Sequence, residues 1–369
     1  MIIALDGRKI EQKNGIGRVT SNIISHLLNH DRINNYILFL DKNCSNIKFK
    51  NKNLKIIYIY NSKYNNLKTI YELFFLHYIL NKEKVDIFLS TDNFINIFFY
   101  KGKIYLTILD LIPLDYDYFK STYNKIRYRL VLKLILMNNI YKIVTISHFS
   151  EEKIVKLLKI PKEKILVIPL GTNKVNYSLN DIKKFSIKIN YKYILAIGGL
   201  EKRKNNITLI KAYINLVKKK ELNNYHLIII SNKKDNILGE KILREYPHKL
   251  TENIIFTEEI SNKNLSYLYE NASIFVYISL YEGFGLPPLE AFSHNVPVIS
   301  SNSTSIPEIL ANGAILINPK SQKELEISIK KIIEKKNLAT TLIHNGKERL
   351  KLFDWNKTVE LLIRNFNNI

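Results

Sequence analysis

The sequence predicts an α/β protein made of two Rossmann-like domains, each built on a parallel β-sheet. Short runs rich in Ile, Leu and Val alternate with longer segments whose apolar residues recur at helical spacing, which is the pattern of parallel strands covered by helices. At 369 residues the chain is long for one domain and comfortable for two. Its 46% of hydrophobic residues suffice for two full cores.

A polar stretch without strand character separates the two predicted domains. We expect a first domain over residues 1–172, a linker over 173–190 and a second domain over 191–345, followed by a C-terminal helical segment over 346–369. The composition of the linker favours this boundary, because connections between domains run through exposed polar segments.

Composition narrows the classes of function. The single cysteine, Cys44, excludes an internal disulfide and a metal site made of several cysteines. The chain begins with a short apolar strand rather than a signal peptide, and no apolar run is long enough to span a bilayer. These features predict a cytoplasmic location.

The formal net charge of +23 leaves several interpretations open. Lys, Asn and Ile are abundant together, which is the composition that an AT-rich coding sequence gives, so one interpretation is compositional drift. The others are an anionic membrane surface, which implies a peripheral membrane location, and an acidic ligand. We expect no nucleic-acid partner, because the chain lacks an aromatic–basic RNA motif, a zinc finger and an isolated basic tail.

The first domain is predicted to alternate strands with helices. Gly15-Ile16-Gly17-Arg18 lies between its first strand and first helix, an order typical of nucleotide-binding units, although the motif is not a complete GxGxxG. The predicted strands are Met1–Leu5, Tyr36–Leu40, Leu54–Tyr60, Val85–Leu89, Ile104–Leu109, Val144–Ser147 and Ile165–Pro169. The predicted helices are Val19–Leu28, Leu67–Asn81, Ser121–Asn139 and Glu151–Leu158, the last capped by Ser150.

The helix predicted over Ser121–Asn139 has a basic face. Its cations recur every four residues and so share that face: Lys125, Arg129 and Lys133. The opposite apolar face, which we expect to be buried, contains Leu130, Val131, Leu134 and Ile135. A solvated basic face over a buried apolar one is the favoured interpretation, and a helix at a membrane surface is the alternative.

The second domain is predicted to centre on a glycine-rich turn. An apolar strand from Ile274 leads into Glu282-Gly283-Phe284-Gly285, and Pro287 and Pro288 then suit the first turn of a helix. A helix N-terminus attracts phosphates and sugar hydroxyls, and Glu290 lies about one turn inside it. The two glutamates could therefore contact two parts of one elongated ligand. The alternative is that Glu282 only interacts favourably with the helix dipole and that Glu290 is a solvated helix residue.

The stretch from Tyr281 to Pro307 resembles the Glu-x7-Glu signature of glycosyltransferase family four, the group 1 glycosyltransferases, which has the GT-B fold. This resemblance implies that Glu282 contacts the sugar of a nucleotide-sugar donor and that Glu290 binds the ribose hydroxyls. The backbone of the turn would hold the sugar and the phosphates, at Gly283, Phe284, Gly285 and Leu286.

Two further segments resemble the same family. In Gly-x-Leu-x-x-Arg-Lys-Asn, after the first strand of the second domain, the resemblance assigns Arg203 and Lys204 to the donor diphosphate. Gly15 and Gly17 resemble a glycine turn that lies near the donor phosphates across the interdomain cleft. Leu109 occupies a position at which the family often has a histidine, so one polar group of that cleft is absent.

The resemblance implies a retaining, metal-independent hexosyltransferase with no cofactor, whose two domains face a cleft and whose C-terminal helix returns to the first domain. GDP-mannose is the expected donor, with a UDP- or dTDP-sugar next, and the acceptor is a glycan or a lipid-linked glycan. The one D-x-D, Asp115-Tyr116-Asp117, is interpreted as a loop rather than a metal motif. A nucleotide-sugar 2-epimerase of the same fold and a non-catalytic GT-B scaffold remain alternatives.

Overall fold

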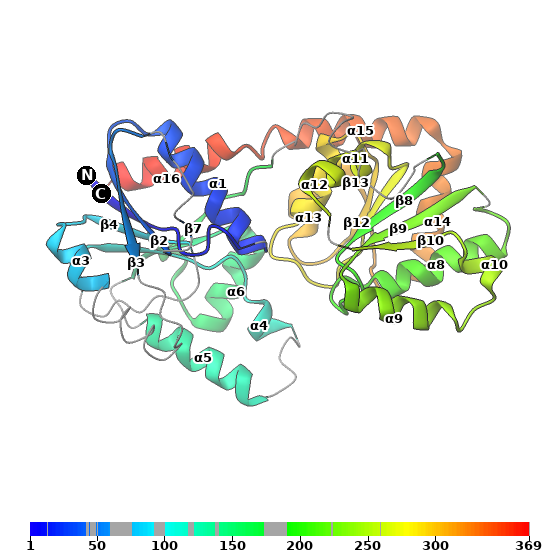
Figure 1. The fold of residues 1–369 in the computed structure, drawn as a ribbon, viewed down its shortest axis with the longest axis horizontal. Coiled ribbons are helices and arrows are strands. Elements are labelled where there is room, and N and C mark those ends of the chain that lie inside the picture. Colours follow the sequence, from blue (N-terminus) through cyan, green and yellow to red (C-terminus); the bar gives the residue numbers. More distant parts are fainter. Residues whose placement is uncertain are drawn as a thin grey trace. The chain divides into compact units, whose positions relative to one another are not determined.

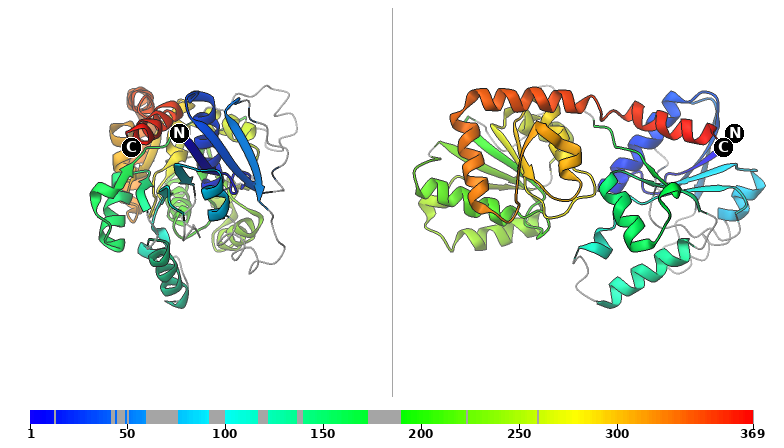
Figure 2. Two further views of the ribbon diagram at one scale, coloured as in Figure 1. Left: turned by 90° about the vertical axis from the view of Figure 1, so that its left-hand side faces the viewer. Right: turned by 180° about the vertical axis from the view of Figure 1, so that it is seen from behind.

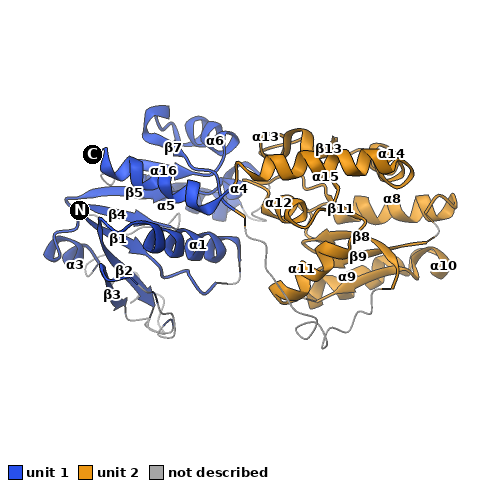
Figure 3. Ribbon diagram, turned by 90° about the horizontal axis from the view of Figure 1, so that it is seen from above, with its two compact units in different colours: residues 1–171, 354–369 blue, residues 172–353 orange. Residues whose placement is uncertain are grey.

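The computed structural model describes the chain except for residues 13, 42–43, 45–48, 50, 60–75, 92–99, 117–121, 137–139, 173–189, 223, 259 and 369. Most of the predicted linker and the first part of the predicted Leu67–Asn81 helix lie outside the described residues. The chain forms two compact units, each of which is α/β. Unit 1 contains Met1–Gly171 and Asp354–Ile369, and unit 2 contains Thr172–Phe353 (Figure 3).

Unit 1 is built on a seven-stranded parallel sheet in the order β3-β2-β1-β4-β5-β6-β7 (Figure 1). Its strands are β1 Ile2–Asp6, β2 Asn35–Asp41, β3 Leu54–Ile59, β4 Ile87–Ser90, β5 Lys103–Thr107, β6 Ile140–Thr145 and β7 Ile165–Val167. Its helices are α1 Gly15–His30, α3 His77–Lys82, α4 Ile112–Asp115, α5 Thr122–Leu136, α6 His148–Leu158 and, at the end of the chain, α16 Trp355–Asn367.

Unit 2 has a six-stranded parallel sheet in the order β10-β9-β8-β11-β12-β13. Its strands are β8 Lys192–Ile197, β9 Tyr225–Ile230, β10 Ile254–Thr257, β11 Ile274–Tyr277, β12 Val298–Ser301 and β13 Ala314–Ile317. Its helices are α8 Asn206–Lys218, α9 Lys233–Leu243, α10 His248–Thr251, α11 Asn262–Asn271, α12 Leu286–Ser293, α13 Ile306–Leu310, α14 Gln322–Glu334 and α15 Lys336–Leu350.

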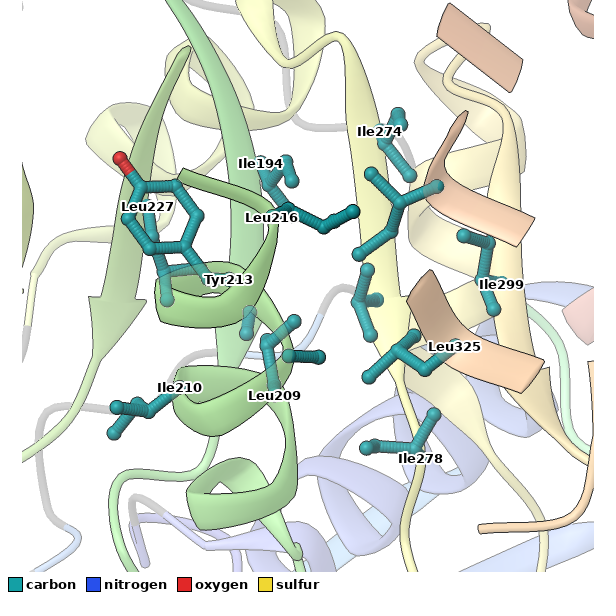
Figure 4. Packing of buried hydrophobic residues seen from close by; sticks show 14 of the residues in the cluster. Ile194, Leu209, Ile210, Tyr213, Leu216, Leu227, Ile274, Ile278, Ile299 and Leu325 are labelled. Carbon is teal, nitrogen blue, oxygen red and sulfur yellow. The ribbon is translucent and has the colours of Figure 1, made fainter. Parts of the chain in front are cut away.

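The core of unit 2 forms where α8 and α14 cover the strands. Figure 4 shows Leu209 and Leu216 of α8 beside strand residues, with Leu325 of α14 completing the cluster. β-Branched Ile and Val dominate the strands, because such side chains fill a pleated surface that is buried on both faces. The near-continuous apolar runs in the sequence are thus explained by this burial.

Two helices begin earlier than the sequence pattern predicts. α1 starts at Gly15 rather than at Val19, because the Asn14 side chain accepts a hydrogen bond from Gly17 N (3.0 Å) and so caps the helix. α6 starts at His148, and its cap is Ser147 rather than Ser150. In both cases a polar side chain satisfies a helix donor before the apolar periodicity begins.

The burial predicted for α5 is confirmed for Ile135 and wrong for Leu130, whereas Val131 is partly buried. Leu132 and Ile135 are buried, but Leu130 is 56% exposed. Two further apolar residues of α5 are also exposed, Tyr123 at 71% and Ile126 at 55%. Spacings of three and four residues place these three exposed side chains along one stripe of the helix.

α16 packs on α1 within unit 1, as Figures 1 and 2 show. The Trp355 ring stacks on His26 of α1 with ring centroids 6.1 Å apart. At the other end of α16, Phe366 meets the Tyr105 ring edge-on at 5.0 Å and is fully buried. The last helix of the chain is therefore part of the core of unit 1.

We predict that Phe366→Ala lowers the free energy of unfolding of unit 1 by about 3–5 kcal/mol, because it leaves a cavity under α16. Trp355 is the only tryptophan of the chain, so its fluorescence during denaturation by urea reports on this unit. Leu361→Ala on the same helix is the control and should change the free energy by less than about 0.5 kcal/mol, because Leu361 is 37% exposed. Equal effects of both substitutions would contradict the packing described.

Candidate active site

The candidate site of unit 2 lies at the carboxyl ends of β8 and β11. These two strands are adjacent in the sheet, and the chain order reverses between them, since β9 and β10 extend to one side and β12 and β13 to the other. In open α/β sheets such a switch point is where ligands bind, because the loops that follow the two strands diverge there.

The loop after β8 is shaped by glycines. Gly198 has φ of +99°, and a Cβ atom added to it would lie 2.6 Å from Cγ of Lys204. A side chain at this position would therefore push Lys204 away. The Asn205 amide anchors the loop by donating to the carbonyl oxygens of Ile278 (3.2 Å) and Pro319 (2.7 Å).

The loop after β11 contains the glycine-rich turn and leads into α12. Gly285 has φ of +114° and precedes a helix whose first turn holds the two prolines, as the sequence predicts. The Ser305 hydroxyl lies within hydrogen-bonding distance of two carbonyl oxygens of the turn, those of Glu282 (2.9 Å) and Phe284 (3.1 Å). The Thr304 hydroxyl accepts from the Glu282 amide (3.2 Å). Sequence reasoning missed this support, because it depends on a contact across about twenty residues.

Three charged side chains from the two loops converge on one oxygen atom. Lys204 Nζ and Arg203 Nη1 each lie 2.8 Å from Oε1 of Glu282. Lys204 Nζ also donates to the Tyr277 hydroxyl at 2.8 Å. All three charged side chains are nearly buried, with exposures of 11–15%. The structure thus brings together the residues that the sequence analysis assigned to the donor sugar and to the diphosphate.

The electrostatics of this cluster keep Glu282 ionised. Burial alone would raise the pKa of the Glu282 carboxyl, but the positive charges of Lys204 and Arg203 lower it below its ordinary value. Burial likewise opposes the charge of Arg203, yet the neighbouring Glu282 and Glu201 raise the pKa of its guanidinium. Arg203 is further held by Glu201 Oε1 (3.0 Å) and the Tyr281 carbonyl oxygen (3.0 Å).

Glu290 lies in α12 and is 4% exposed. Its Oε2 accepts a hydrogen bond from the Tyr269 hydroxyl (3.1 Å) of α11. The Tyr269 ring stacks on His294 with centroids 5.3 Å apart. Glu290 is therefore not a solvated helix residue, because its carboxyl group is buried and oriented by a tyrosine.

The candidate residues of unit 1 lie at the carboxyl ends of its strands. Gly15 and Gly17 form the first turn of α1, and a Cβ atom on Gly17 would lie 2.0 Å from the carbonyl oxygen of Gln12. Close packing thus explains Gly17 without a ligand. After β5, Asp110 accepts from the Ile112 amide (3.1 Å) and so helps to form the turn into α4.

A metal site is not evident in the part of the chain that the structure describes. No group of three or more potential acidic, His or Cys ligands occurs there. Asp115 of the D-x-D is paired with Lys153 at 2.6 Å, and Asp117 lies outside the described residues. Arg203 and Lys204 are cationic side chains that lie next to the glycine-rich turn.

Residues 179–349 match the model of the family "Glycosyl transferases group 1". The chain is 32% identical over 228 residues to the O-antigen chain mannosyltransferase RfbU of Salmonella typhimurium, covering 62% of this chain and 60% of that protein. It is 30% identical over 220 residues to O-antigen chain mannosyltransferase B of Escherichia coli, covering 58% and 57%. The predicted resemblance to the group 1 glycosyltransferases is confirmed. The match spans about three fifths of the length of these relatives.

Solved structures agree on the fold along the whole chain. Sucrose-phosphate synthase from Thermosynechococcus elongatus has a TM-score of 0.76 at 18% identity, covering 100% of this chain and 98% of that one. Anabaena HepE in complex with UDP-glucose has a TM-score of 0.73 at 15% identity, covering 100% and 99%. The predicted GT-B fold, with two Rossmann-like units on parallel sheets, is thereby confirmed.

The shared carboxylate predicts a pH-dependent stability. The Glu282 pKa is lowered from 4.5 in the folded state, so its ion pairs stabilise the fold above about pH 4.5 and this stabilisation is lost as the pH falls through the lower, folded value. Glu282→Gln should therefore lower Tm at pH 7, and the difference from wild type should shrink below pH 4.5. Differential scanning calorimetry tests this, with the exposed Glu240→Gln as the control. A difference that is the same at pH 3.5 and pH 7 would contradict it.

Proposed function

We propose that the protein is a retaining hexosyltransferase that moves a sugar from a nucleotide-sugar donor to a glycan or a lipid-linked glycan. The observation that carries this proposal is the convergence of Arg203 and Lys204 on Glu282, beside the glycine-rich turn at the switch point of unit 2. The group 1 glycosyltransferase match over residues 179–349 includes all of these residues.

The residues of the site have distinct proposed roles. Lys204 and Arg203 stabilise the negative charge that grows on the departing diphosphate, together with the amides from Gly283 to Leu286 at the start of α12. Glu282 faces the sugar and stabilises the positive charge that develops at the anomeric carbon. Glu290, oriented by Tyr269, accepts hydrogen bonds from the ribose.

The proposed chemistry needs no protein base. The bond between the anomeric carbon and the diphosphate oxygen breaks, and the acceptor oxygen forms its new bond on the same face of the sugar. The acceptor proton passes to the leaving diphosphate oxygen, so the configuration is retained. Leucine at position 109 is compatible with this route, since no histidine is required to take the proton.

GDP-mannose is the proposed donor, and a UDP- or dTDP-sugar is the next candidate. The names of the two curated relatives described above support a mannosyl donor, and the EGFGLPPLEA form of the turn agrees with it. Neither those relatives nor the family model support the epimerase alternative. In the same proposal the transfer is independent of metal, because Arg203 and Lys204 supply the positive charge.

We further propose that α5 contacts an anionic membrane surface. Its exposed stripe of Tyr123, Ile126 and Leu130 is flanked by exposed cations, namely Lys125, Arg127, Arg129 and Lys133. Apolar side chains that enter the interface, bordered by cations that meet lipid headgroups, are the features of an interfacial helix. Among the described residues no helix is long and apolar enough to cross a bilayer.

A donor screen tests the enzymatic proposal. GDP-mannose at 100 times its Kd should stabilise the folded protein by about 2.7 kcal/mol, seen as a rise in Tm, and should do so in EDTA. UDP- and dTDP-sugars are the comparison, and Lys204→Met is the matched variant that should bind all of them more weakly. If no nucleotide-sugar raises Tm at millimolar concentration, the enzymatic proposal is wrong. If transfer requires added magnesium or manganese, metal independence is wrong.

Liposome flotation tests the membrane proposal. The protein should float with vesicles that contain phosphatidylglycerol, less with pure phosphatidylcholine, and less at high salt. Ile126→Asn should weaken flotation because it removes apolar area from the stripe. Ile237→Asn on α9 is the control, since Ile237 is equally exposed (54%) but belongs to unit 2. Equal flotation of both variants, or equal binding to neutral and anionic vesicles, would refute this contact.

A further inference from the structure

Tyr277 lies at the centre of the candidate site, although the sequence around it does not predict a role there. It is the last residue of β11 and is 3% exposed. Its ring stacks on Phe275 with centroids 6.1 Å apart, and its carbonyl oxygen accepts from the Ser300 hydroxyl (2.6 Å) of β12. Ring and backbone are both fixed by the sheet, so the phenol oxygen has a fixed position.

This phenol oxygen bridges the ion pair of the site. Lys204 Nζ donates to it at 2.8 Å and also donates to Glu282 Oε1 at 2.8 Å. Burial, and then the charge of Glu282 and a hydrogen bond to it, raise the pKa of Tyr277 well above its ordinary value. The phenol therefore stays protonated and donates a hydrogen bond to Glu282, while its oxygen accepts one from Lys204. The three groups form a closed triangle of hydrogen bonds.

A fixed third partner matters because a lysine side chain that is held by one ion pair alone is flexible. Its ammonium stands on a flexible four-carbon stem, so one ion pair to Glu282 would leave many positions open. A second contact to a rigid phenol selects one of them. Charges stabilise a transition state most when they are held in place before the reaction, because no reorganisation is then required.

We propose that Tyr277 is a positioning residue of the transfer reaction, which holds Lys204 and Glu282 in the arrangement that the departing diphosphate and the sugar require; this role rests on the proposed function. In this proposal Tyr277 acts through Lys204 and Glu282 and not by contact with either substrate. Its removal should therefore affect the transition state more than the binding of the donor.

Tyr277→Phe tests this role, because it keeps the ring and removes only the bridging oxygen. We expect kcat to fall about tenfold or more, as for the loss of a hydrogen bond to a charged group, and the donor KM to change less than about threefold. The acidic limb of the pH profile should move to higher pH, since the Glu282 carboxylate loses a donor and its pKa rises. A merely structural tyrosine would not move this limb.

Tyr213→Phe is the matched control. Tyr213 is also fully buried in unit 2, but its hydroxyl donates to the backbone carbonyl oxygen of Tyr225 (2.6 Å), outside the site. It should cost stability without changing kcat or the pH profile at a temperature where both variants are folded. If Tyr277→Phe behaves like Tyr213→Phe, the positioning role is refuted.

A second readout does not depend on catalysis. In Tyr277→Phe the Lys204 ammonium keeps its contact with the ring but loses one of its two hydrogen bonds, the one to the phenol oxygen. Acetic anhydride should therefore acetylate Lys204 at least about threefold faster, as measured by mass spectrometry. Tyr213→Phe should leave this rate unchanged. An unchanged Lys204 rate in Tyr277→Phe would overturn the triangle even if the enzyme is active. Failure of the wild type to bind or use any donor would instead overturn the proposed function, and the acetylation result would still stand.

Discussion

The buried carboxylate of Glu282 is the interaction on which the arrangement of unit 2 around its switch point depends. It lies in the loop after β11, and both of its cationic partners, Arg203 and Lys204, lie in the loop after β8. Removing one member of a buried ion pair leaves an uncompensated charge and costs several kcal/mol, so the two loops are strongly held together. The glycines in these loops make this pairing possible, because they let the backbone turn so that the charged groups come into contact.

The same cluster is electrically balanced when no ligand is bound. Two cations, Arg203 and Lys204, face two carboxylates, Glu201 and Glu282. Under the proposed function, a diphosphate that enters this site must compete with Glu282 for the cations. When the diphosphate draws the two cations away, the Glu282 carboxylate keeps more of its negative charge. It can then stabilise positive charge on the sugar more strongly. A balanced cluster also avoids the cost of burying two unpaired cations in the unliganded protein.

Local signals in the sequence predict much of this fold and part of its site. Parallel strands, the two glycine-rich loops and the start of α12 follow from short patterns of apolar residues, glycine and proline. The bridge by Tyr277 was not predictable, because it depends on how β11 is placed beside β8. The exposed side chain of Leu130 was missed for a related reason, since helical spacing shows that a stripe exists but not whether another element covers it. The roles of Glu282 and Glu290 stay predictions.

The glycine-rich turn is also coupled to the place where the chain leaves unit 2. Phe284 is buried in the turn, and its ring meets Phe353, the last residue of this unit, edge-on at 5.7 Å. Phe353 is held in turn by the Arg349 guanidinium 5.4 Å from its ring centroid, and its carbonyl oxygen accepts from the Thr172 amide (3.2 Å), where the chain enters the unit. Both ends of unit 2 are therefore joined at Phe353, and their packing depends on the position of Phe284. Packed aromatic rings cannot move far unless a side chain changes its rotamer. A shift of the turn would therefore displace Phe353 and, through it, the two chain ends.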